Sequence, residues 1–80
     1  MSVGYDELKA LAGCGKSWAE EKAQMAIEFA DQHAKGELSA DEYKELLEDL
    51  IRTDRLDEEA DDMAVKMALV GAVKGLMLVV

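Results

Sequence analysis

The last third of the chain, residues 53–80, constrains the fold more than any other stretch because its character changes abruptly. Residues 54–62 are densely acidic, and residues 63–80 are almost wholly apolar. A helix that is apolar on every side is normally found at the centre of a bundle, in an oligomer interface or in lipid. The remaining residues are therefore expected to form helices that cover this segment or present it to another molecule.

Helical spacing divides the final segment into three faces. We expect its helix to span residues 55–79, with Asp54 as the N-cap, because acidic residues suit the positive end of the helix dipole. One stripe has heptad spacing and comprises Leu56, Ala60, Met63, Met67, Val70, Lys74 and Met77. A second stripe comprises Val65, Leu69, Val73, Leu76 and Val80. A third strip holds small residues that permit close backbone approach, namely Ala64, Ala68, Gly71 and Gly75.

Two lysines argue against a transmembrane segment. The apolar run approaches the lower limit of a spanning helix, about 17–25 residues. Lys66 and Lys74 interrupt the run. A lysine at mid-bilayer costs roughly 2.5–3.5 kcal/mol, against about 0.3–0.6 kcal/mol gained for each Leu or Val. A buried or interfacial helix of a soluble protein is therefore favoured, and a membrane-associated protein is the less favoured alternative.

The composition favours an all-α fold. The 80 residues include no proline, and helix-forming residues dominate. A core of this size rarely supplies more than about 3–5 kcal/mol, so many such chains gain stability from a partner. We predict one helical domain, residues 1–80, folded as a small irregular bundle of three to four helices spanning residues 5–12, 18–35, 40–52 and 55–79. Within it, residues 1–16 are expected to form a short helix and connector, 17–52 a helical hairpin and 53–80 the final helix.

Glycine and serine residues mark the expected helix ends. Gly13 is predicted to end the first helix in the left-handed conformation, and Gly36 to end the second. Two Ser-x-x-Glu sequences have the spacing of capping boxes, Ser17 with Glu20 and Ser39 with Glu42. The large residues of the second helix follow one face, and its alanines make up much of the remainder.

The net charge of −9 is concentrated in the middle of the chain, because residues 36–62 alone carry a net −9 while the two flanking segments cancel each other. An acidic surface repels nucleic-acid phosphates, so direct DNA or RNA binding is not expected. The charge suits a basic protein partner, imitation of a nucleic acid, or simple solubility. One cysteine, Cys14, and the lack of a signal-peptide pattern indicate a reducing cytoplasm, or a virion or host cytoplasm if the protein is viral.

Two stretches resemble ligand-binding loops but lack essential residues. Residues 12–17 resemble the end of a phosphate-binding P-loop, yet Ala10 stands where that motif needs glycine, and no strand precedes it. Residues 31–42 resemble the calcium loop of an EF-hand. Their third and fifth positions are His33 and Lys35, which supply no oxygen ligand. We therefore expect neither nucleotide nor calcium binding.

The chain carries no recognisable catalytic constellation. Cys14 has no base placed near it by sequence, and a lone histidine on a helix face is more often structural than catalytic. One Cys and one His do not form a structural zinc site. We predict no enzymatic activity, no catalytic or metal-binding residues and no cofactor. The region of the calcium-loop likeness is also similar to the short helical hairpins that promote oligomerisation at protein C-termini, in its order of helix, glycine, small cap residue, acidic residues, aromatic residue and Leu-Leu. This resemblance implies self-association.

The leading hypothesis is a non-enzymatic protein–protein interaction or assembly module, acting on another protein or forming homo-oligomers. The apolar interaction residues are expected to be Leu56, Met63, Met67, Leu69, Val70, Gly71, Val73, Gly75, Leu76, Met77 and Val80. An acidic belt is expected to set specificity, comprising Glu48, Asp49, Asp54, Asp57, Glu58, Glu59, Asp61 and Asp62. The alternatives are an acidic nucleic-acid mimic that inhibits a basic host protein, of the viral or mobile-element type, and a membrane-associated protein.

Overall fold

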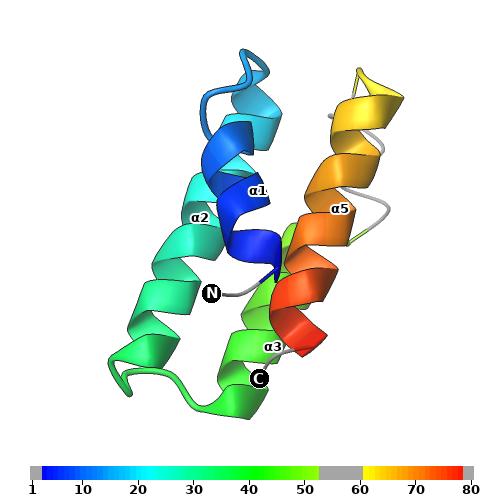
Figure 1. Ribbon diagram of the computed structural model, residues 1–80. Helices are drawn as coiled ribbons and strands as arrows, with labels where there is room; N and C mark the ends of the chain where they lie inside the picture. Colours follow the sequence, from blue (N-terminus) through cyan, green and yellow to red (C-terminus); the bar gives the residue numbers. More distant parts are fainter. Residues whose placement is uncertain (1–2, 53–60, 79–80) are drawn as a thin grey trace.

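The computed structural model describes residues 3–52 and 61–78. These residues form helices α1 (Val3–Leu11), α2 (Ser17–Ala34), α3 (Ala40–Leu50) and α5 (Met63–Leu78), and none of them lies in a strand. The predicted all-α bundle is confirmed. Figure 1 shows α1 between α2 and α5, and the packing of α1 against α5 is more extensive than that of any other pair of these helices.

The turn between α2 and α3 forms as the sequence predicts. Gly36 has a φ of 81°, in the left-handed region, and its N–H donates to the His33 carbonyl oxygen over 3.0 Å. The Ser39 hydroxyl accepts from the Glu42 N–H over 3.2 Å, and the Glu42 carboxylate accepts from the Ser39 N–H over 3.1 Å. This capping box is complete, so α3 begins where expected.

The turn between α1 and α2 differs from the prediction. Gly15, not Gly13, takes the left-handed conformation, with a φ of 91°. Its N–H donates to the Glu20 carboxylate over 3.0 Å. Ser17 is itself the first helical residue, and the N-cap residue Lys16 makes no side-chain cap bond. The predicted capping box at Ser17 is therefore wrong, because Glu20 binds the connector instead.

Helix α5 begins later than the predicted residue 55. Asp61 and Asp62 are not helical. The Asp62 carboxylate accepts from the N–H groups of Ala64 and Val65, over 3.0 and 3.2 Å. These bonds satisfy two amides that have no partner within the helix, so the second of two adjacent aspartates starts α5. The N-cap predicted at Asp54 falls outside the described residues.

In the core, bulky side chains of α1, α3 and α5 pack against a face of α2 that is made of alanines. The largest fully buried side chains come from α1, α3 and α5 and are Leu8, Leu47, Leu69, Val73 and Leu76. Helix α2 buries only small side chains, those of Ala19, Ala23 and Ala26. Trp18 and Phe29 are half-buried beside them, and Met25 is 44% exposed. The alanine face of α2 therefore faces the core and lets its neighbours approach closely.

Helices α1 and α5 meet at the level of their backbones. A β-carbon at Gly4 would overlap the carbonyl oxygen of Ala72, and one at Gly75 would lie 3.4 Å from the Gly4 nitrogen. The close approach predicted for the small-residue strip thus occurs at Gly75. Gly71 lies on the exposed side, where an added β-carbon would meet nothing within 4 Å.

Candidate interaction surface on the last helix

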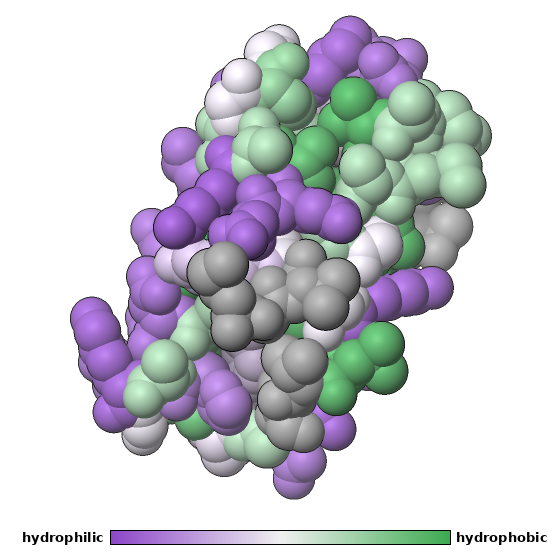
Figure 2. Space-filling view, viewed as in Figure 1, coloured by the Kyte–Doolittle hydropathy of each residue, from purple (hydrophilic) through white to green (hydrophobic). Residues whose placement is uncertain are grey.

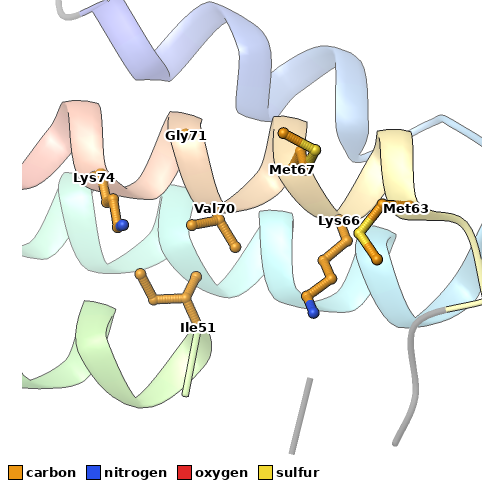
Figure 3. A pocket seen from close by; sticks show the side chains of 7 residues that line it. All are labelled: Ile51, Met63, Lys66, Met67, Val70, Gly71 and Lys74. Atoms are coloured by element: carbon orange, nitrogen blue, oxygen red, sulfur yellow. The ribbon is translucent and has the colours of Figure 1, made fainter. Parts of the chain in front are cut away.

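One face of α5 points away from the core. Six of its residues follow helical spacing along one side, namely Met63, Lys66, Met67, Val70, Gly71 and Lys74. Together with Ile51, just after α3, they line an open groove of about 460 Å³. We call these seven residues the outward face. In Figure 3 the side chains of Lys66, Val70 and Lys74 extend from α5 toward the side on which Ile51 lies.

The outward face exposes large apolar side chains. Met63 is 65% exposed and Met67 is 67% exposed, whereas Leu69 on the same helix is completely buried. Figure 2 shows apolar residues gathered over the first turns of α5 and hydrophilic residues over α2. Methionine has three flexible torsions and a polarisable sulfur, so it adapts to many apolar partners. The two exposed methionines can therefore change conformation without a change in the rest of the fold.

Not all of the predicted apolar interaction residues lie on this surface. Leu69, Val73 and Leu76 belong to the core of the chain, so they are unavailable to a partner in this fold. Gly75 is half-buried against α1. Met77 is half-buried beside the core. Leu56 and Val80 lie outside the described residues. Leu69, Val73 and Leu76 of the second predicted stripe therefore pack inward, against α1, α2 and α3.

The described residues that line the groove include two lysines and no carboxylate. Helix α5 carries Lys66 and Lys74 and no acidic residue, in a chain whose net charge is −9. Lys74 is exposed and Lys66 is half-buried. Both ammonium groups belong to side chains that line the groove. The described part of the groove therefore combines apolar side chains with two lysines.

The acidic belt separates into residues with different structural positions. Glu48 and Asp49 are exposed on α3, and Asp49 pairs with Arg52 over 2.9 Å. Asp61 accepts a hydrogen bond from the Trp18 indole over 3.0 Å and pairs with Lys16 over 3.5 Å. Since Asp62 caps α5, both of these aspartates hold the start of that helix. The belt residues Asp54, Asp57, Glu58 and Glu59 are not among those described.

The Trp18 contact changes the acidity of Asp61. The hydrogen bond from the indole, followed by the charge of Lys16, holds the pKa of the Asp61 carboxyl below its ordinary value. The aspartate therefore stays ionised to lower pH than a free one. Because the same carboxylate touches both Trp18 and Lys16, it ties the residues before α5 to the beginning of α2.

The residues of the two loop resemblances are bonded within the chain. The Gly15 amide, which a phosphate loop would direct at its ligand, donates to Glu20. The His33 ring stacks on Tyr43, with centroids 4.6 Å apart and planes 8° apart. The Asp31 carboxylate accepts from the Tyr5 hydroxyl over 3.4 Å. Among the described residues there is no group of three or more His, Cys, Asp or Glu that could hold a metal ion.

Sequence reasoning missed two contributors to the groove. Ile51 is not among the predicted interaction residues, although its side chain lines the groove opposite α5. The two lysines were treated as interruptions of an apolar helix, although they line the groove. The available signal was their eight-residue separation, which places both on one side of a helix together with Val70.

Comparisons with protein-family models, with curated protein sequences and with solved structures find no match to the chain. No helix in the described part of the chain has the length and apolarity needed to cross a membrane.

Proposed function

We propose that the protein is a non-enzymatic helical interaction module that uses the outward face of α5 to assemble with another helix. The observation that carries this proposal is the groove formed by α5 and Ile51, with Met63 and Met67 about two-thirds exposed at its edge. Large exposed apolar side chains that lie together, bordered by polar groups, mark interaction sites on small proteins. The groove suits the helix-in-groove mode of recognition, in which an apolar helix face contacts residues at i, i+3, i+4 and i+7.

The rest of the fold supports a scaffold role. One side of α5 is fixed by buried contacts of Leu69, Val73 and Leu76, so its other side is presented on a rigid element. Asp62 and the Trp18–Asp61 bond set where α5 begins. A preorganised surface loses less conformational entropy on binding than a flexible one. The cytoplasm remains the proposed location because Cys14 is an exposed free thiol, which a reducing compartment preserves.

The proposal is tested with the full chain and a double variant, Met63→Gln with Met67→Gln. Solution mass is measured by light scattering for self-association, and binders are selected from a library of helical peptides. We expect assemblies or selected peptides that the double variant loses. Met25→Gln is the matched control, because Met25 is 44% exposed on α2 and lies outside the groove. Association that survives the double substitution, or no association by either method, would overturn the proposal.

Exposed carboxylates on α3 support a second candidate, an acidic inhibitor that imitates nucleic acid. Asp41, Glu45 and Glu48 are exposed and share one side of that helix by their spacing. Such a protein, of viral or mobile-element type, would bind a basic DNA-binding protein with steep salt dependence. The test is binding to an immobilised basic protein across a salt series, with Glu45→Gln and Glu48→Gln. Salt-independent binding, or binding that the substitutions leave unchanged, would reject this candidate.

A further inference from the structure

We propose that the start of α5, residues 63–68, opens and closes as a unit while the rest of the helix stays packed, and that Asp61 holds it closed. We call residues 63–68 the start segment, and the contact of Asp61 with Trp18 and Lys16 the clasp. Figure 1 shows the beginning of α5 and the beginning of α2 at the same end of the molecule. The inference concerns the motion of the chain itself and does not depend on the proposed function.

Burial divides α5 into two unlike parts. Leu69, Val73 and Leu76 are buried in the core. In the start segment no residue is completely buried, because Val65 and Lys66 are half-buried and the others are exposed. A short helical piece is marginal in water unless tertiary packing supports it. Regions with few buried apolar contacts open at a lower free energy than the core. Helix α5 is therefore expected to open from its beginning and not along its whole length.

The clasp connects the residue before the cap of α5 to the beginning of α2. The Asp61 carboxylate accepts from the Trp18 indole N–H over 3.0 Å and pairs with the Lys16 ammonium over 3.5 Å. The Trp18 side chain packs against the core, so the donor is held in place. An exposed ion pair contributes little, whereas a hydrogen bond to an ionised acceptor is stronger than one between neutral groups. The bond from Trp18 is therefore the main part of the clasp.

The position of Asp61 couples the clasp to the start segment. The adjacent Asp62 accepts from two N–H groups of the segment with its carboxylate, and from the Lys66 N–H with its carbonyl oxygen over 2.9 Å. Because Asp61 is tied to α2, Asp62 is held where it can make these bonds. Met63 and Met67 lie in the same segment. The clasp therefore also sets the fraction of molecules in which both methionines are presented on a formed helix.

The test is amide hydrogen exchange of the full chain, followed residue by residue with NMR. In the unsubstituted protein the amides of Lys66 and Ala68 should exchange faster than those of Val73 and Leu76, because the start segment opens without the core. Asp61→Ala should accelerate exchange in the start segment by at least about threefold, which corresponds to the loss of one hydrogen bond. The amides of Val73 and Leu76 should keep their rates.

Two further variants separate the clasp from general destabilisation. Trp18→Phe removes the donor and keeps an aromatic ring, so it should accelerate the start segment more than the core. Asp49→Ala is the matched control, because it removes an exposed aspartate that pairs with Arg52 on the other side of the chain's ion pairs and should leave exchange in α5 unchanged. Equal exchange rates along α5, or equal acceleration throughout it, would overturn the local opening. Unchanged exchange in both clasp variants would overturn the role of Asp61. Circular dichroism confirms that each variant is folded.

Discussion

Gly4 lies so close to the carbonyl group of Ala72 that a single methyl group added at Gly4 would overlap its oxygen atom. This contact joins the first and last described helices without any large side chain between them. Gly75 on α5 lies at the same crossing, where a β-carbon added to it would be 3.4 Å from the Gly4 nitrogen. The packing of α1 on α5 therefore depends on the lack of a side chain at particular positions, in addition to the burial of Leu8.

Gly4→Ala is expected to destabilise the fold by about 1–3 kcal/mol, because the β-carbon can be accommodated only if α1 moves away from α5. Gly71→Ala, on the exposed side of α5, is the control. An added methyl at Gly71 meets nothing within 4 Å, so the higher helix propensity of alanine should stabilise the protein by up to about 1 kcal/mol. Urea unfolding followed by circular dichroism measures both. Equal effects of the two substitutions would contradict the close crossing.

Ser39→Ala is expected to lower the free energy of unfolding by about 1 kcal/mol, because it removes the cap that accepts from the Glu42 N–H. Ser17→Ala is the matched control, since it also precedes a glutamate by three residues but lies beyond the N-cap of α2. Its effect should stay within about 0.5 kcal/mol. Chemical denaturation of the two variants decides the matter. If Ser17→Ala lowered the free energy of unfolding as much as Ser39→Ala, Ser17 would cap α2 after all, contrary to the structure.

Leu69→Ala and Met67→Ala test which side of α5 faces the core. Leu69 is fully buried, so its truncation should cost about 2–5 kcal/mol. Met67 is 67% exposed, so its truncation should change stability by less than about 0.5 kcal/mol. Thermal and urea unfolding of the isolated chain provide the comparison. The inward and outward assignments would be reversed if the Met67 variant proved the less stable.

The bond between Trp18 and Asp61 should be visible as an acid transition in tryptophan fluorescence. The pKa of Asp61 in the folded state is lowered, so its carboxylate stabilises the fold above the ordinary value of 3.8 and this contribution is lost as pH falls through the folded value. Trp18 is the single tryptophan of the sequence, so the signal reports this site. Asp61→Asn cannot titrate and should remove a transition whose midpoint lies below 3.8. A transition unchanged in Asp61→Asn would belong to other carboxylates.

The sequence predicted helix ends correctly where a single residue, such as a glycine or an N-cap serine, determines where the helix ends or begins. Gly36 and Ser39 fix the turn between α2 and α3 by their own backbone and side-chain geometry, so no distant contact is needed to recognise them. Ser17 has the same pattern as Ser39, and only the left-handed turn at Gly15 directs Glu20 elsewhere. The start of α5 was misplaced because several aspartates before it are equally good caps, and the bond from Trp18 to Asp61 is not readable from spacing.

The candidate site was only partly predictable for a related reason. The sequence identifies three apolar or small faces on α5, but it does not say which companion helix covers which face. Which face of α5 is covered depends on two features. One is the approach of Gly4 to Gly75, which the sequence does not reveal, and the other is the alanine face of α2. Once these two contacts bury Leu69 and Val73, the side with Met63 and Met67 has to point outward.

The pairing of α1 with α5 also sets the order in which the molecule can be completed. The hairpin of α2 and α3 is local in sequence and can form as soon as its own residues have been synthesised, whereas α1 gains its main packing surface only after α5 has left the ribosome. Until then Leu8 has no α5 side chains to pack against. Helix α1 therefore reaches its final packing only after α5 has been synthesised.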